Sequence, residues 1–171
     1  EIPAGTAHFL EHKMFEMEDG GDAFDYFAPT GADANAFTSS LTTCYLFSCT
    51  ECFDESLEIL LDMVATPHFT GESVMREKDI IAQEIKMTED QPSDAIYYGL
   101  MDALYENNGH RIRVAGTVES ISGITAETLR RAHSVFYNLR NMALFVCGNV
   151  TPESVIAVAD AVLTEADDAP F

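Results

Sequence analysis

Apolar residues recur along much of this chain at the spacing of one helical face. The clearest set is Leu57, Leu60, Leu61 and Val64. It predicts a helix over residues 54–65 that ends before Pro67. By similar patterns and by start and stop signals, we expect further helices at residues 6–16, 22–27, 72–89, 92–105, 125–136 and 152–163.

Other apolar patterns predict strands. Residues 33–38 alternate in the manner of a half-buried strand, and residues 42–49 follow after a short break, so we expect the two strands to pair. The continuous apolar run at residues 142–147 suits a buried strand. Together these elements predict the α+β fold class. No repeat, low-complexity tract or change in composition divides the 171 residues, so we expect a single domain.

The sequence His-Phe-Leu-Glu-His at residues 8–12 places two imidazoles and one carboxylate on a single helical turn. His8 and His12 would lie about 40° apart around the helix and one turn along it, so both rings can reach one cation. Glu11 projects beside them. Zinc hydrolysis requires two neutral nitrogen ligands, an open coordination position for water and a nearby base. His-x-x-Glu-His, the inverse of the commoner zinc peptidase motif, is itself a catalytic signature.

Histidines at this spacing also occur as ordinary surface or core residues, so a third ligand decides between the two interpretations. Catalytic zinc sites usually have three protein ligands, and in hydrolases the usual partner is a carboxylate. Glu77 and Glu84 would differ by about 20° in direction in the helix at residues 72–89, and they therefore share one face. A solvated acidic helix is the alternative, which fits a chain with 29 acidic residues.

Three segments, in this order, resemble the pitrilysin/insulysin family of inverted-motif zinc metallopeptidases. They are residues 5–12 (Gly-Thr-Ala-His-Phe-Leu-Glu-His), 31–38 (Gly-Ala-Asp-Ala-Asn-Ala-Phe-Thr) and 76–84 (Arg-Glu-Lys-Asp-Ile-Ile-Ala-Gln-Glu). Their separations are also similar to those of the family, and the resemblance extends from residue 2 to about residue 153. Residues 13–16 and 113–117 favour the short bacterial members.

The resemblance implies a role for each of five residues. The implied zinc ligands are His8, His12 and Glu84, the implied catalytic base is Glu11, and the implied supporting carboxylate is Glu77. The implied cofactor is one Zn²⁺ per chain, and the reaction is hydrolysis of peptide bonds by water that the metal activates. Glu11 would take a proton from the water and deliver it to the departing amine. Glu77 would orient a ligand imidazole or the water.

The segment at residues 33–38 also has an implied role. In the family the equivalent strand borders the cleft, and an extended peptide substrate could pair with its edge through main-chain hydrogen bonds. The predicted substrate contacts are therefore Asn35, Ala36 and Phe37. A purely structural edge strand is the alternative.

The resemblance further implies that residues 1–171 are a fragment of the zinc-binding N-terminal half of such a peptidase. Its fold would be a mixed, largely antiparallel sheet with helices packed on one side, without the strands that open the family's half-unit. Family members pair this half with a homologous second half, in the same chain or in a partner subunit, and the two enclose a chamber. We therefore expect the isolated residues to bind zinc but to be inactive or weakly active.

Composition excludes some partners. The formal net charge of −20 argues against nucleic acid, because acidic side chains repel phosphates. No apolar run of about 18 residues predicts a membrane span. The four cysteines do not form the framework of a small disulfide-rich domain, so a reduced, cytoplasmic location is the default expectation. They are Cys44, Cys49, Cys52 and Cys147.

Two other functions stay open at this point. Some family subunits have lost ligands and act as non-catalytic scaffolds or binding subunits of a paired peptidase, but here all five catalytic positions are intact. A metal-free interaction domain, in which the motif arises by chance, is the third interpretation. Zinc binding that is lost when His8 or Glu84 is replaced would fit only the enzyme lineage.

Overall fold

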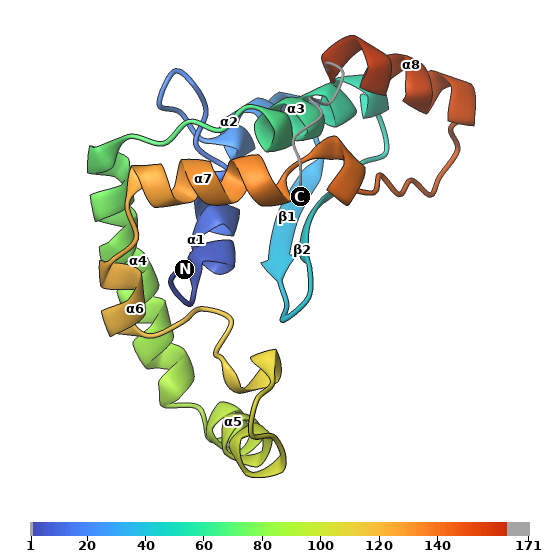
Figure 1. Cartoon of the computed structure of the whole chain (residues 1–171). Helices are drawn as coiled ribbons and strands as arrows, with labels where there is room; N and C mark the ends of the chain where they lie inside the picture. Colours follow the sequence, from blue (N-terminus) through green and yellow to red (C-terminus); the bar gives the residue numbers. More distant parts are fainter. Residues whose placement is uncertain (1, 164–171) are drawn as a thin grey trace. The chain divides into compact units, whose positions relative to one another are not determined.

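Helices dominate the computed structural model, which describes residues 2–163 (Figure 1). Each helix in that range is too short or too polar to span a bilayer. By its internal contacts the chain divides into two compact units, each assembled from separate segments. Within the described range, unit 1 comprises residues 2–13, 37–44 and 69–129, and unit 2 comprises residues 14–36, 45–68 and 130–163.

Unit 1 is built around the contact between helices α1 and α4 (Figure 1). Its elements are α1 (Thr6–Lys13), α4 (Gly71–Glu89), α5 (Pro92–Leu104), the 3-10 turn η2 (Gly109–Arg111) and α6 (Val118–Ser122). Phe9 and Leu10 of α1 are buried, as are Ile81 and Ile85 of α4. Full burial of each such side chain contributes roughly 1.5–3 kcal/mol, so apolar burial on both helices stabilises unit 1.

Side-chain caps and one proline mark where the helices of unit 1 begin. Thr70 Oγ1 accepts the N–H of Ser73 at the start of α4, and Pro92 lies in the first turn of α5. Thr117 and Ser120 form a capping box at the start of α6. Helix α6 is not predicted from the sequence, because this helix is only five residues long and its box has serine where glutamate or glutamine is usual.

Three elements contribute residues to both units. They are strand β1 (Asp33–Thr38), strand β2 (Thr43–Ser48) and helix α7 (Ala126–Phe136). The two strands pair as predicted, and the short turn between them makes the pair antiparallel. Alternation along β1 buries Ala34 while Asn35 is exposed, as expected for a strand with one face toward a core.

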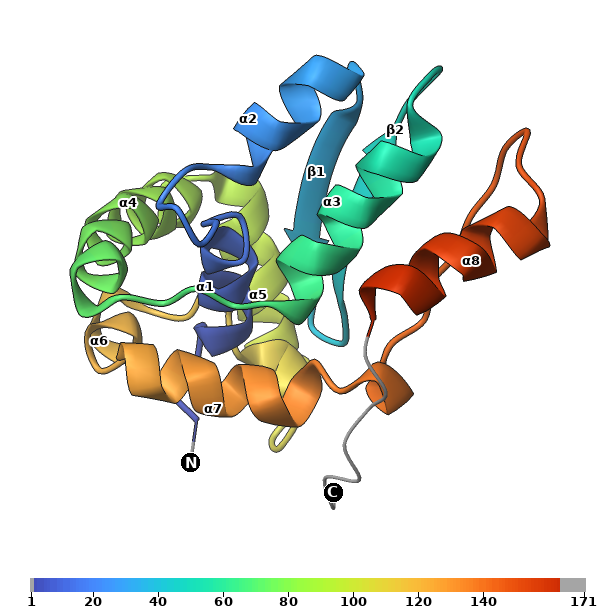
Figure 2. The same cartoon turned by 90° about the horizontal axis from the view of Figure 1, so that it is seen from above.

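Unit 2 has its apolar core between the hairpin and two helices. Its other elements are α2 (Ala23–Phe27), η1 (Ala28–Thr30), α3 (Phe53–Ala65), η3 (Leu139–Asn141) and α8 (Pro152–Val162). Phe27 of α2 and Ala34 of β1 belong to one buried cluster with Leu60, Met63 and Val64 of α3. Helix α3 also packs along α8 (Figure 2).

Helix α1 is shorter than the predicted helix at residues 6–16. It ends at Lys13, and Glu16 instead pairs with Asp22 in an isolated antiparallel bridge. The turn at Gly20 and Gly21 closes this bridge, because the Gly20 N–H bonds to the Met17 carbonyl and the Met17 N–H bonds to the Gly21 carbonyl. Two consecutive glycines favour the turn over continuation of the helix.

The prediction of a buried strand at residues 142–147 is wrong. The segment is irregular, and the side chains of Leu144 and Phe145 are 46% and 87% exposed. A strand needs a neighbour to pair its backbone N–H and C=O groups, and among residues 2–163 the sheet contains only β1 and β2, neither of which pairs with this segment. The predicted fold class is therefore met only in part: the described residues are mostly helical, with one small antiparallel sheet rather than a larger sheet covered on one side.

Two glycines allow a close backbone approach within unit 1. Gly5 and Gly116 have φ of +89° and +73°, a region that favours glycine. A Cβ at Gly116 would lie 2.5 Å from the Ala4 carbonyl oxygen, and a Cβ at Gly5 would lie 2.5 Å from the Ala115 carbonyl oxygen. Ser120 Oγ donates to the same Ala4 oxygen at 2.8 Å. The segment that leads into α1 is therefore joined directly to the loop at residues 113–117.

We expect Gly116→Ala to lower the free energy of unfolding by about 2 kcal/mol or more, because alanine adds both an unfavourable φ and a clash with backbone. Urea denaturation followed by circular dichroism measures the effect. Gly99→Ala is the matched control, since Gly99 lies within α5 and a Cβ added there would meet open space. That change should be neutral or slightly stabilising. Equal unfolding midpoints for the two variants would contradict the assigned role of Gly116.

Candidate metal centre

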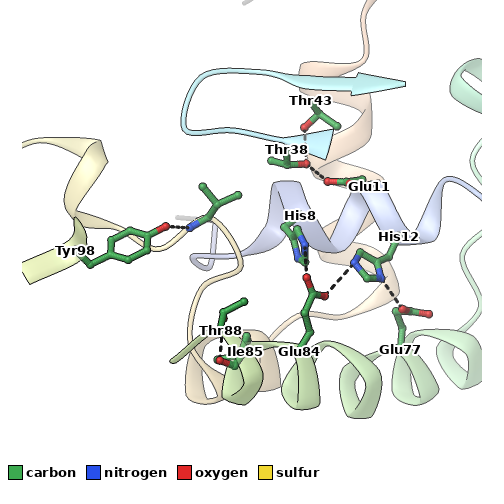
Figure 3. A network of polar contacts seen from close by, with 11 residues as sticks. His8, Glu11, His12, Thr38, Thr43, Glu77, Glu84, Ile85, Thr88 and Tyr98 are labelled. Atoms are coloured by element: carbon green, nitrogen blue, oxygen red, sulfur yellow. Dashed lines mark hydrogen bonds and ion pairs between the residues drawn. The ribbon is translucent and has the colours of Figure 1, made fainter. Parts of the chain in front are cut away.

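Side chains from α1 and α4 converge on one point in unit 1 (Figure 3). His8 and His12 lie one turn apart on α1 and face Glu84 of α4, and one ligand atom from each residue lies within 4.8 Å of the other two. The His8 Nε2 atom is 3.5 Å from Glu84 Oε1, and the His12 Nε2 atom is 3.4 Å from Glu84 Oε2. Glu84 therefore bridges the two imidazoles.

These separations fit a shared cation better than direct hydrogen bonds. Good N–H···O hydrogen bonds measure about 2.7–3.2 Å, which is shorter than either contact of Glu84. Two ligand atoms held tetrahedrally at about 2.0–2.1 Å from a zinc ion lie about 3.4 Å apart. Two imidazoles with one carboxylate also form a donor set of catalytic zinc sites, with the fourth position open to water or substrate. The residues present therefore fit zinc.

Glu77 fixes the orientation of His12. The His12 Nδ1–H donates to Glu77 Oε1 at 2.9 Å. This hydrogen bond, together with the charge of His12, lowers the pKa of Glu77, which keeps that carboxylate ionised and able only to accept. The neutral imidazole of His12 must then carry its proton on Nδ1, which leaves the Nε2 lone pair directed toward Glu84.

The two histidines have different electrostatic environments. Burial lowers the pKa of His8, and the charge of His12 lowers it further, so His8 is held in the neutral form that a metal ligand needs. Burial also acts to lower the pKa of His12, but the hydrogen bond and charge of Glu77, with the charge of Glu84, outweigh it and raise the pKa. The His8 Nδ1 atom is buried and has no hydrogen-bond partner among the described residues.

Glu11 is held by Thr38, a residue that no sequence motif assigned to the site. Thr38 Oγ1, at the end of β1, donates a hydrogen bond to Glu11 Oε2, and Thr43 Oγ1 lies 3.2 Å from Thr38 Oγ1 (Figure 3). The sequence carries a signal for Thr38, which follows Ala34 and Ala36 on the inward-facing row of the strand and is polar where that row is otherwise apolar.

The three predicted substrate contacts lie on β1, outside the metal cluster. Asn35 and Phe37 are exposed and alternate with Ala36 along the strand, and Phe37 is 54% exposed. The Ala36 N–H already bonds to Asn35 Oδ1 at 2.8 Å. Their role in substrate binding stays a prediction.

Comparison with protein families gives two matches that together cover most of the chain. Residues 2–118, which include the metal cluster, match the model described as insulinase (peptidase family M16). Residues 123–169 match the model described as the M16 inactive domain.

Individual proteins and solved structures give the same similarity. The chain is 49% identical over 156 residues to the zinc protease YmfH of Bacillus subtilis, and 33% identical over 162 residues to the zinc protease ML0855 of Mycobacterium leprae. It covers 36% of each of these proteins, about a third of their length, while 91% of this chain is aligned.

A crystal structure of an M16-like peptidase from Alicyclobacillus acidocaldarius superposes with a TM-score of 0.93 at 40% identity, covering 100% of this chain and 41% of that one. A Helicobacter pylori protease shares the fold at 22% identity, with a TM-score of 0.87, over 97% of this chain and 42% of that one.

We expect His8→Ala and Glu84→Gln each to abolish stoichiometric zinc binding, because each removes one of three clustered donors. Glu77→Gln should weaken zinc affinity by about 10–100-fold, as loss of an outer carboxylate commonly does. Zinc per chain, measured by mass spectrometry after dialysis, checks all three. Glu89→Gln, at the exposed end of α4, makes the same charge change away from the cluster and should retain the metal. Full zinc content in Glu84→Gln would contradict the assignment.

Proposed function

Because this chain belongs to the insulinase family of peptidases, M16, we propose that it is the zinc-binding part of a zinc-dependent endopeptidase. The observation that carries the proposal is the cluster of His8, His12 and Glu84, with its His₂-carboxylate donor set. The two aligned bacterial relatives are themselves named zinc proteases, which supports the same activity here.

The metal would be held by side chains of two helices. His8 and His12 of α1 and Glu84 of α4 would bind one Zn²⁺ per chain, with Glu77 holding the His12 ring through Nδ1. When bound, zinc supplies a Lewis acid that activates water at neutral pH and polarises the scissile carbonyl. Glu77 thus acts on the reaction only through His12.

Glu11 would move the proton in this reaction. Thr38 occupies its Oε2 atom, which leaves Oε1 to accept a proton from the water as the water oxygen bonds to the carbonyl carbon. The same atom then gives that proton to the amine nitrogen as the carbon–nitrogen bond breaks. One water is consumed, Glu11 returns to its ionised form, and no covalent bond to the protein is required.

Substrate and partner are also part of the proposal. An extended peptide would pair with β1 near Asn35, Ala36 and Phe37, where main-chain pairing tolerates many sequences. A homologous second half, in the same polypeptide or in a partner subunit, would complete the chamber around the peptide. The coverage of about a third of the relatives' length supports this, and the fold also matches a structure titled as the first half of the periplasmic protease PqqL, at 22% identity.

The activity is tested by Glu11→Gln in the full-length gene product. We expect peptide turnover to fall by about 10²–10⁴-fold while zinc content is unchanged, because glutamine cannot accept the proton. Cleavage of a quenched fluorescent peptide library, with metal analysis in parallel, provides the measurement. Glu18→Gln, an exposed acid outside the site, should cleave as the wild type does. A wild type that binds zinc but cleaves no peptide would overturn the proposed function.

Variants that remove or retain the hydroxyl of Thr38 test its role. Thr38→Val keeps the shape but removes the donor to Glu11, and we expect kcat to fall about tenfold with KM and zinc content unchanged. Thr38→Ser retains the donor and should recover most of the activity. Steady-state kinetics on one peptide distinguish the variants. If serine were as impaired as valine, Thr38 would act through packing instead.

A further inference from the structure

A cavity of ≈ 210 Å³ in unit 1 begins at the metal cluster and extends away from it. His8 and Glu84 form one part of its lining, and Asp94 and Tyr98 of α5 line another part, together with residues 113–116. Sites for drug-sized ligands measure about 300–1,000 Å³, so this cavity suits one amino-acid-sized group. Because its wall includes two residues of the cluster, a group inside it would lie close to a bond cleaved there.

Arg113 is the only lysine or arginine among the described residues that line this cavity. Its guanidinium carbon lies 4.5 Å from the centre of the Tyr98 ring. The Tyr98 hydroxyl, which Figure 3 shows, accepts the N–H of Val114 at 3.4 Å. Stacking on the ring holds the side chain in place without using its hydrogen-bond donors. No carboxylate of the described residues forms an ion pair with Arg113, whereas Arg111 pairs with Asp102 at 2.9 Å.

The charge of Arg113 is unusual in its surroundings. The chain has 29 acidic and nine basic residues, so an arginine without a carboxylate partner is unexpected. With a divalent cation in the cluster, the charge of the cation would offset most of the charge of the carboxylates around it, which leaves Arg113 opposed by Asp94 in the rest of the cavity wall. A guanidinium in a partly enclosed wall attracts an anion. The planar guanidinium matches a carboxylate in particular.

We propose that this cavity binds a carboxylate of the peptide substrate next to the cleaved bond, with Arg113 as the residue that recognises it. The proposal rests on the peptidase function proposed above and names a preference within it. The carboxylate can come from an aspartate or glutamate side chain or from the C-terminus of a short peptide. Asp94, in the same wall, opposes the binding and limits how strong the preference is.

The test uses peptides that differ only in this group. One pair carries glutamate or glutamine beside the cleaved bond, and each peptide is made with a free or an amidated C-terminus. The ratio of kcat/KM within each pair is measured for the zinc-loaded full-length gene product. Equilibrium binding of the same peptides to the zinc-loaded Glu11→Gln variant gives a second ratio that does not depend on turnover.

We expect the peptide with the carboxylate to be favoured about tenfold, as one charge-assisted hydrogen-bonded pair provides. Arg113→Gln should remove this preference, and Arg113→Lys should retain part of it. Asp94→Asn should increase it, and this variant keeps the proposal testable if Arg113→Gln fails to fold. Arg111→Gln makes the same charge change two residues away, outside the cavity lining, and should leave the ratio unchanged.

The outcomes separate the sources of the carboxylate from each other. Preference for internal glutamate identifies a side chain, and preference only for the free C-terminus identifies the peptide end, and either supports the proposal. Equal ratios in the wild type, or a preference that survives Arg113→Gln, would overturn it. If no peptide is cleaved but Glu11→Gln still prefers the carboxylate, the peptidase function fails while the carboxylate site stands.

Discussion

The register between α1 and α4 is the constraint on which the site depends. His8 contacts Glu84, whereas His12 contacts both Glu84 and the earlier Glu77, so the two helices run in opposite directions where they meet. Ile81 and Ile85 of α4 are buried, so a change of register would also expose apolar surface. A shift of one residue would turn either helix by about 100° and carry the donors away from one another.

Within that register, each carboxylate has a different task because each has a different neighbour. Glu77 accepts a hydrogen bond from an imidazole N–H and stays ionised, Glu84 lies between two Nε2 atoms, and Glu11 accepts a hydrogen bond from the Thr38 hydroxyl of the hairpin. Three acids this close together repel one another, and a bound cation offsets that repulsion. The repulsion among these carboxylates thus favours the binding of a cation, and their hydrogen bonds orient the side chains around it.

The sequence predicted those features of the molecule that depend on local signals. Helical periodicity located α3 and α4, and the four-residue spacing of His8 and His12 predicted that both rings can reach one cation, because a helix converts sequence separation directly into direction. The choice of Glu84 over Glu77 as the third ligand came from the family resemblance. Non-local features were not accessible in the same way. The run at residues 142–147 has the composition of a strand, but strand formation depends on a pairing partner that composition does not reveal.

The same limit applied to Thr38 and Arg113. Each makes its contact with a residue distant in sequence or lines a cavity, and the sequence segments in which they lie assigned neither of them a chemical role. The sequence signals for both residues are weak: an inward-facing threonine in an apolar row, and an arginine in a strongly acidic chain. Their contacts become visible only in the structure. The unpredicted helix α6 belongs here too, since its Ser120 anchors the loop after Arg113 to Ala4.

The contact of Gly5 with the loop before Gly116 sets the distance between the start of α1, which carries His8, and the cavity wall that carries Arg113. The proposed metal site and the proposed carboxylate site are therefore joined by a contact of main chain with main chain. Because this contact is made by main chain, a change of the side chain at position 113 should leave the entry to α1, and with it the metal cluster, in place. The position of the loop is thus set by main chain, while the side chain at position 113 decides what the cavity beside the metal cluster can bind.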